Sequence, residues 1–265
     1  MRPMDWLDAL FLGIVQGLTE FLPVSSSGHL EIGQALLHTA SEEHLTFTVA
    51  VHIATVLSTV CVFWKDLLQL LKGCCRFAWN EETRYVATLV VSMIPVLVVG
   101  LFFRDAVEQI FGNGLRLTGT MLLVTALLLF IAHKCASGTK PAISFKDAFV
   151  IGIAQACAVL PGLSRSGATI STGLMLGNKK DNVARFSFLM VLAPILGEAL
   201  LDGMEIGQSA ASGIGLLPLA IGFLAAFVSG FLACRWMLRL IRRSKLIWFA
   251  VYCAVVGLFT LFILS

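Results

Sequence analysis

Long apolar segments restrict what this chain can fold into more than any other feature of its sequence. Six predominantly apolar runs occur, at residues 47–64, 86–103, 117–132, 186–201, 213–234 and 246–264. Each is near the ~20 residues that an α-helix needs to cross the hydrocarbon of a bilayer. A water-soluble domain could not cover the apolar surface of a chain that is 58% hydrophobic and only 13% charged. We therefore predict an all-α integral membrane protein with six spans.

Two further apolar regions, at about residues 5–37 and 146–177, are interrupted by Gly, Pro and Ser. Each is long enough for two short helices with a break between them, but not for one regular span. No long polar linker separates the segments, so we expect residues 1–265 to form a single integral membrane domain of about ten helices. We expect no signal peptide, because the N-terminal apolar run carries Gln16 and Glu20 in place of a small-residue cleavage site.

The basic residues gather in four loops between these segments. Fifteen of the 19 lysines and arginines lie in residues 65–84, 133–146, 179–185 and 235–245. Because cytoplasmic loops are enriched in Lys and Arg, we expect all four to face the cytoplasm. The two interrupted regions must then be re-entrant hairpins, the first entering from outside and the second from inside, with both termini outside. We expect no nucleic-acid partner, because cations spread over short loops between spans do not form one basic face.

An internal repeat relates the two interrupted regions. A shift of 139 residues aligns residues 13–28 (GIVQGLTEFLPVSSSG) with residues 152–167 (GIAQACAVLPGLSRSG) without a gap, and six of the 16 positions are identical. The identical pairs are Gly13/Gly152, Ile14/Ile153, Gln16/Gln155, Ser25/Ser164, Ser27/Ser166 and Gly28/Gly167.

Each aligned segment begins a unit of one broken hairpin followed by three spans. The first unit covers about residues 1–137 and the second about residues 138–265. Because three is an odd number, the second unit is expected to be inverted relative to the first. Inverted-topology repeats whose broken helices meet near the midplane recur among membrane proteins.

The two breaks carry polar side chains of different kinds. The first break offers Gln16, Glu20, Ser25, Ser26, Ser27 and His29, and the second offers Ser164, Arg165, Ser166 and Thr169. Ionisable residues at membrane depth are costly and are therefore candidates for a functional role. An acid, a base and hydroxyls in one break complement a cation and hydroxyls in the other. His52, within a predicted span, is a weaker candidate for contact with the same site.

These groups are the ones that phosphoryl transfer requires. Ser25 and Ser164 occupy N-cap positions, so each break precedes a helix N-terminus whose free N–H groups can bind an anion. Arg165 adds a forked, permanently charged clamp for phosphate. The hydroxyl of Ser26 or the imidazole of His29 could attack phosphorus, while a nearby carboxylate takes or steers a proton.

Two motifs resemble the signature regions of the undecaprenyl-diphosphate phosphatase family, the bacitracin-resistance proteins. The first motif is QGLTEFLPVSSSGH, which includes Gln16 and Glu20 and ends at His29. The second is LPGLSRSGATISTGLMLG, whose PGxSRSxxT pattern is matched by Pro161, Gly162, Ser164, Arg165, Ser166 and Thr169. The resemblance covers essentially the whole chain. Many family members have Glu at the position of Gln16, and since an amide cannot act as a general base, we expect Glu20 to be the essential carboxylate.

The resemblance implies hydrolysis of the terminal phosphate of a C55 polyprenyl diphosphate at the outer face of a bacterial plasma membrane. The products are the monophosphate lipid carrier of peptidoglycan synthesis and inorganic phosphate, and the reaction limits bacitracin, which captures the diphosphate lipid. The prenyl tail would stay among membrane lipids between the spans.

The expected site has two sets of residues. The catalytic set is Glu20, Ser26, His29 and Arg165, with Ser26 and His29 as competing nucleophiles and with Glu20 or His29 as the base for Ser26. The substrate-binding set is Gln16, Ser25, Ser27, Ser164, Ser166 and Thr169. A divalent cation, Mg²⁺ or Ca²⁺, could bridge Glu20 and the diphosphate but is not required. The sequence leaves the oligomeric state open, with a homodimer as one alternative.

A transporter or flippase of the polyprenyl phosphate carrier is the alternative function. An inverted repeat with a site near the midplane is the architecture that alternating access uses. Such a protein would need the same anion-binding groups, but it would not need Ser26 or His29 as reacting groups.

Overall fold

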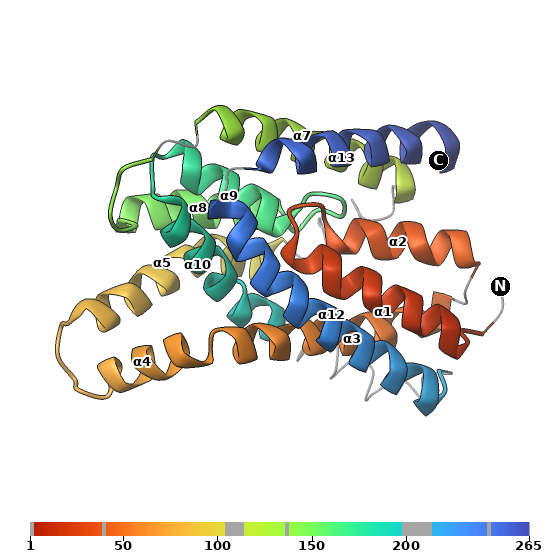
Figure 1. The fold of residues 1–265 in the computed structure, drawn as a ribbon, viewed down its shortest axis with the longest axis horizontal. Helices are drawn as coiled ribbons and strands as arrows, with labels where there is room; N and C mark the ends of the chain where they lie inside the picture. Colours follow the sequence, from red (N-terminus) through yellow and green to blue (C-terminus); the bar gives the residue numbers. More distant parts are fainter. Residues whose placement is uncertain are drawn as a thin grey trace.

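The structure is a computed structural model that describes residues 3–38, 41–103, 114–135, 138–197, 214–242 and 245–264. Within these ranges the chain is α-helical, and its β-structure is limited to one isolated bridge between Lys140 and Asn178 (Figure 1). The helices are α1 (Trp6–Phe21), α2 (Ser26–Leu37), α3 (Ser41–Val62), α4 (Trp64–Cys74), α5 (Glu81–Phe102), α7 (Gly114–Lys134), α8 (Phe145–Cys157), α9 (Arg165–Met175), α10 (Lys180–Met190), α12 (Leu216–Arg242) and α13 (Leu246–Phe259), the last continued by a π-helical turn (Thr260–Leu264). The predicted all-α class is confirmed.

Five helices in the described ranges are long and apolar enough to cross a membrane. They are α3, α5, α7, α12 and α13, and they coincide with five of the six predicted spans. Many of their large apolar side chains, such as Phe102, Leu216 and Phe262, are exposed, as expected for helices in lipid. The chain is therefore a multi-pass membrane protein.

The sixth predicted span, residues 186–201, is only partly described. It begins inside α10, which ends at Met190, and the chain is helical again over residues 192–197. Residues 198–201 lie outside the described ranges. The sixth span therefore stays a prediction.

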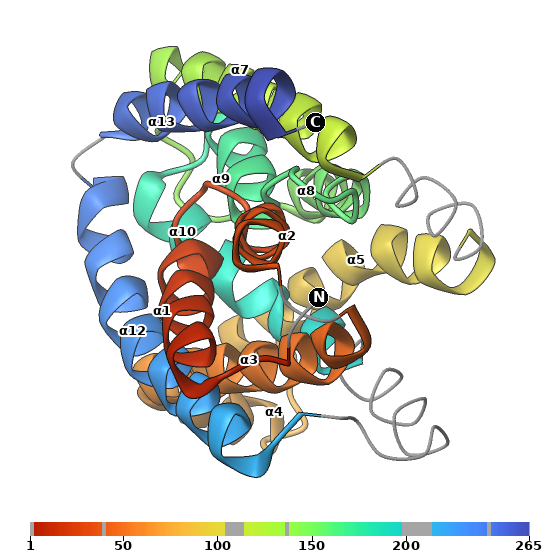
Figure 2. The same ribbon diagram turned by 90° about the vertical axis from the view of Figure 1, so that its right-hand side faces the viewer.

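Both interrupted regions form two short helices separated by a break, as predicted. The helices α1 and α2 have 16 and 12 residues, and α8 and α9 have 13 and 11. All four are shorter than the ~20 residues that a span needs. Figure 2 shows these four helices in the middle of the molecule, with α12, α7, α13 and α5 around them.

Close helix crossings hold the short helices in place. The helix α1 packs along α12, and α8 packs along α5. At Gly13 a Cβ atom would overlap the backbone oxygen of Gly222, and at Gly152 it would overlap that of Ser92. Because each crossing has a glycine at the contact, the backbones approach closely, as they do at small-residue helix contacts in membranes.

Candidate functional site

The first break lies between the end of α1 and the start of α2. Leu22, the C-cap of α1, has an extended backbone. Ser25 is the N-cap of α2, and its Oγ accepts a hydrogen bond from the Gly28 N–H at 3.3 Å. Its φ angle is 72°, a value that residues with a Cβ atom rarely adopt. The first break therefore contains backbone strain, at the residue next to Ser26.

The second break lies between α8 and α9. Ser164 is the N-cap of α9, with φ of −68°, and its Oγ accepts from the Gly167 N–H at 3.0 Å. Gly162 has φ of 86°, and a Cβ atom there would overlap the backbone of Thr118. Glycine is therefore required at this turn. The sequence thus predicted the N-cap of α9 correctly, as it did that of α2.

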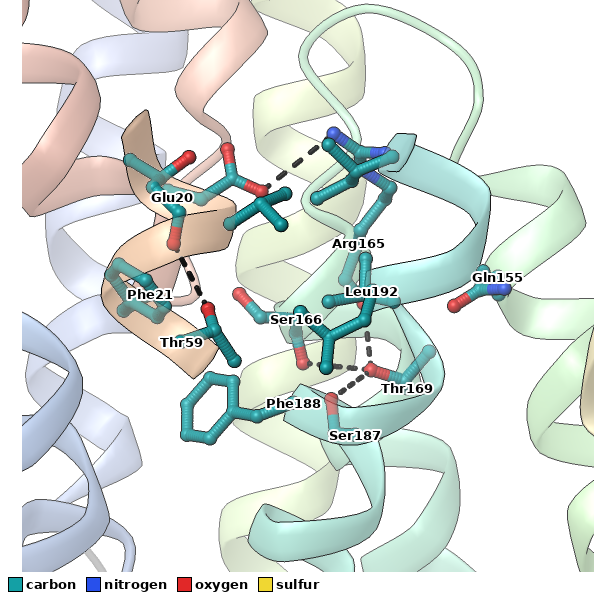
Figure 3. Close-up of a pocket in the computed structure, with 14 residues that line it drawn as sticks. Glu20, Phe21, Thr59, Gln155, Arg165, Ser166, Thr169, Ser187, Phe188 and Leu192 are labelled. Atoms are coloured by element: carbon teal, nitrogen blue, oxygen red, sulfur yellow. Dashed lines mark hydrogen bonds and ion pairs between the residues drawn. The ribbon is translucent and has the colours of Figure 1, made fainter. Parts of the chain in front are cut away.

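The two breaks contact each other directly. The Ser166 hydroxyl, at the start of α9, donates to the carbonyl oxygen of Leu22 at 3.2 Å. An Nη atom of Arg165 lies 3.7 Å from Oε1 of Glu20, and Figure 3 shows these two side chains facing each other. Segments about 140 residues apart in the chain thus build one polar site.

The Glu20 carboxylate is the centre of this site. Its Oε2 accepts from the Ser26 hydroxyl at 2.6 Å and from Nε2 of Gln16 at 3.0 Å. Nε2 of His52, from α3, lies 3.8 Å from the same oxygen. The Glu20 side chain is only 8% exposed. A buried carboxylate is tolerated when a cation and several donors compensate for the water it has lost, and Arg165 and these three side chains provide that compensation.

His29 lies on α2 but is bound away from Glu20. Its Nδ1 is 2.7 Å from the carbonyl oxygen of Ser25, and its Nε2 is 2.8 Å from the hydroxyl of Tyr252 on α13. The two rings are stacked, with centroids 5.6 Å apart. Because a carbonyl can only accept, Nδ1 carries a proton, and Nε2 of the neutral ring accepts from Tyr252. Both nitrogens of His29 are thus occupied.

The other predicted hydroxyls are bound within the protein. The Oγ atoms of Ser25 and Ser27 are 3.4 Å apart, and those of Ser164 and Ser166, the matched pair in the repeat, are 3.3 Å apart. Thr169 donates to the carbonyl of Arg165 at 2.8 Å, and its Oγ1 lies 2.5 Å from Oγ of Ser187. The Oγ atoms of Ser25 and Ser164 each also accept from one N–H in the first turn of the helix that they cap.

A pocket opens beside Glu20 and Arg165 (Figure 3). Its polar wall also includes Ser166 and Thr169, while Phe21, Phe188 and Leu192 are among its apolar lining. Neither Ser26 nor His29 is part of its lining. The pocket therefore lies on the side of Glu20 that faces Arg165 and α10.

Gln155 also lines the pocket, although sequence reasoning did not select it as a site residue. Its side chain comes from α8, and the residue is 1% exposed. Neither Nε2 nor Oε1 has a hydrogen-bond partner in the part of the chain that the structure describes. The signal that could have identified Gln155 was present, because the internal repeat matches it with Gln16.

Few groups here could bind a metal ion. Within the described ranges no cluster of three or more His, Cys, Asp or Glu residues could hold one. Mg²⁺ is often bound by one or two carboxylates together with the phosphates of a substrate. The single carboxylate of Glu20 therefore fits a cation that a diphosphate brings with it.

The arrangement is suited to phosphoryl transfer. A serine hydroxyl contacts a carboxylate that can accept its proton, which is how a weak nucleophile is activated. A guanidinium beside that carboxylate can hold the oxygens of a phosphoryl group. Two helix N-termini at the breaks can bind further phosphate oxygens.

Comparison with known proteins identifies relatives along nearly the whole chain. Residues 9–259 match the family described as bacitracin resistance protein BacA. A protein of Parabacteroides distasonis named undecaprenyl-diphosphatase is 58% identical over 260 residues, which cover 97% of this chain and 98% of that protein. A protein of Bacteroides fragilis with the same name is 57% identical over 260 residues, with the same coverage. A third with this name, from Salinibacter ruber, is 42% identical over 268 residues, covering 96% of this chain and 97% of that protein.

Proposed function

The chain belongs to the bacitracin resistance protein BacA family, and we propose that it hydrolyses undecaprenyl diphosphate at the two facing breaks. The products are undecaprenyl phosphate and inorganic phosphate. The reaction returns the lipid carrier to peptidoglycan synthesis and removes the diphosphate lipid that bacitracin captures. One observation carries the assignment of this chemistry to the breaks: the Glu20 carboxylate contacts both Ser26, at 2.6 Å, and Arg165, at 3.7 Å.

Ser26 is the nucleophile in the proposed mechanism. As its hydroxyl attacks the terminal phosphorus, its proton passes to Glu20 Oε2, the acceptor of its hydrogen bond. The bond between this phosphorus and the bridging oxygen breaks, and undecaprenyl phosphate leaves. Water then attacks the phosphoserine, which releases inorganic phosphate and restores the serine hydroxyl. Arg165 stabilises the charge on the transferred phosphoryl group in both steps.

His29 is the competing nucleophile, through a phosphohistidine. Its hydrogen bonds to Ser25 and Tyr252 favour Ser26, because neither ring nitrogen is free to attack. In the proposed site His29 holds the first turn of α2 against α13. Ser26, in the same first turn of α2, is then held against Glu20.

The other site residues position the groups that bind the diphosphate in this proposal. Gln16 orients Glu20 through its hydrogen bond of 3.0 Å. The hydroxyls fix the two helix N-termini, whose N–H groups bind the phosphate oxygens. These hydroxyls belong to Ser25, Ser27, Ser164, Ser166 and Thr169. A divalent cation, where the substrate carries one, would be held by Glu20 and would neutralise part of the charge on the diphosphate.

We further propose that the chain is one domain of two inverted repeats, about residues 1–137 and 138–265. The helix contacts support this. The helix α1 of the first unit packs on α12 of the second, and α8 of the second unit packs on α5 of the first. The matched glycines Gly13 and Gly152 lie at these two crossings. In a full repeat each unit has one re-entrant hairpin and three spans, and the sixth span runs through residues 186–201.

The distribution of charge supports an orientation in a bacterial plasma membrane. With the four basic loops in the cytoplasm, both termini and the opening of the site face outward. An outward opening would place the site where the diphosphate carrier is released by peptidoglycan synthesis.

Release of phosphate in detergent tests the function and separates it from lipid flipping. Transport needs two compartments, whereas hydrolysis does not. Purified wild-type protein should release phosphate from a polyprenyl diphosphate, while folded Glu20→Ala and Arg165→Ala variants should release almost none. No release by the wild type, at several Mg²⁺ and Ca²⁺ concentrations, would contradict the proposal and favour a carrier that only binds and moves the lipid.

A further inference from the structure

The buried amide of Gln155 has no role in the chemistry described so far. It lines the same pocket as Glu20 and Arg165, and the residue is 1% exposed. Both its donor and its acceptor atoms are without partners in the described part of the chain. A buried polar group that is left unpaired is destabilising, because it has lost its hydrogen bonds to water and gained none in return. Because this unpaired amide lines a pocket, we expect it to form hydrogen bonds with a ligand that enters the pocket.

The polar neighbours of Gln155 in the pocket have other partners. Thr169 is bound to Ser187 and to a backbone carbonyl, and Ser166 donates to Leu22. Figure 3 shows Gln155 on the other side of Arg165 from Glu20, beyond the start of α9. The partner of the amide is therefore expected to come from outside the protein.

Gln16, the residue of the first break that the repeat aligns with Gln155, has a hydrogen-bond partner that Gln155 lacks. Gln16 donates through Nε2 to Glu20, which lies four residues later on the same helix face. Four residues after Gln155 the chain has Val159, which offers no carboxylate. The repeat thus supplies two buried amides: Gln16 uses its Nε2 atom on Glu20 and leaves only Oε1 unpaired, whereas both polar atoms of Gln155 are without partners in the described ranges.

We propose that Gln155 binds phosphate oxygens of the diphosphate head of the substrate, an inference that rests on the proposed function. Its Nε2 atom has two N–H donors, and phosphate oxygens are acceptors. The amide adds hydrogen bonds beside Arg165 without adding a charge, so it leaves the Glu20–Arg165 pair unchanged. Its Oε1 atom accepts from a water molecule or from a protonated phosphate oxygen.

The test compares Gln155→Leu with Ser171→Ala as a matched control. Ser171 lies on α9, is fully buried, and also has a hydroxyl with no partner in the described ranges, but it does not line the pocket. Three quantities are measured for each protein: KM and kcat with a polyprenyl diphosphate, calorimetric affinity for inorganic pyrophosphate, and Tm. The calorimetric titration needs no turnover, so it tests the inference even if the wild type releases no phosphate.

The proposal predicts a specific combination of results. Gln155→Leu should raise KM and weaken pyrophosphate binding by about tenfold, since a hydrogen bond to a charged group is lost. It should change kcat little, because this contact forms in the ground state and in the transition state alike. Its Tm should be equal to or above that of the wild type, because an unpaired buried group has been removed. Ser171→Ala should leave KM and pyrophosphate affinity unchanged.

Two results would overturn the inference. Unchanged pyrophosphate affinity in Gln155→Leu would show that the amide does not bind phosphate. A lower Tm in Gln155→Leu, with KM restored in a Gln155→Met variant of similar shape, would show that the side chain only packs the pocket. If the wild type released no phosphate but its pyrophosphate binding still depended on Gln155, the result would contradict the proposed function and not this inference.

Discussion

The two breaks have the same cap but not the same backbone or chemistry. In each, a serine caps the following helix by accepting from the N–H three residues later, and a second serine lies two residues after the first. Ser25 has φ of 72°, whereas Ser164 has φ of −68°. The residue between the two serines is Ser26 in the first break and Arg165 in the second.

This difference shows how the same serine-capped helix start can carry a hydroxyl in one break and a cation in the other. Ser26 and Arg165 are the first residues of α2 and α9, and both contact Glu20, one at each carboxylate oxygen. The first break contributes the proposed reacting groups and contains the strained residue. The second has relaxed cap geometry and contributes the cation. The site is complete only when the two are docked together.

The largest effect is expected at Ser26, because only the first break should supply the nucleophile. Ser26→Ala should lower kcat by about 10⁶-fold, the scale seen when the serine nucleophile of a hydrolase is removed. Binding of a polyprenyl diphosphate should change little, since the phosphate-binding groups remain. Phosphate release and equilibrium binding, measured on the same preparation, would test both statements. Near-normal release by Ser26→Ala would instead favour His29 as the nucleophile.

Arg165 tests the contribution of the second break. Arg165→Lys keeps the positive charge but loses the planar fork that binds two phosphate oxygens at once. We expect kcat/KM for a polyprenyl diphosphate to fall by about 10²-fold, less than in Arg165→Ala. Equal losses in the two variants would show that charge alone is insufficient, and full activity in Arg165→Lys would show that the fork is not used.

Two glycine substitutions test whether the breaks are held in equivalent ways. Gly13→Ala and Gly152→Ala each introduce a Cβ atom that overlaps a neighbouring helix backbone. Each should destabilise the protein by about 1–3 kcal/mol, the usual cost of overpacking. Gly100→Ala is the matched control, because a Cβ atom at Gly100 would have no neighbour within 4 Å. A large loss of Tm in only one of the first two variants would argue against equivalent crossings.

The smallest effect concerns the backbone of the caps. Ser25→Gly removes a cap hydroxyl but relieves the positive φ, whereas Ser164→Gly only removes the cap and adds flexibility. We therefore expect Ser164→Gly to be less stable than Ser25→Gly by about 1 kcal/mol. Thermal unfolding of the two variants would measure this difference, and the reverse order would mean that the first break is not strained.

Local sequence patterns predicted the features of this chain that depend on neighbours in sequence. Apolar length indicated the spans, and Gly, Pro and Ser residues indicated the breaks. The one long-range feature that the sequence suggested was the complementary chemistry of the two breaks, and Glu20 of the first does lie beside Arg165 of the second. The cap positions of Ser25 and Ser164 followed from residue type alone.

Other contacts between distant segments were beyond such patterns. The stacking of His29 on Tyr252 joins residues 223 positions apart, and nothing in the sequence around either residue indicates the other. Gln155 was missed because its role depends on the absence of a partner, which only the folded pocket reveals. The repeat matched it with Gln16, but a match in sequence does not say which of two amides is left unpaired.

The ion pair between Glu20 and Arg165 also favours correct docking of the two broken hairpins during folding. If the two broken hairpins failed to dock, each charge would be stranded in an apolar environment without its counterion, at a cost of several kcal/mol. Misdocked molecules are thereby disfavoured before they can accumulate. A titration of working sites in a preparation would thus also count the molecules that had folded correctly.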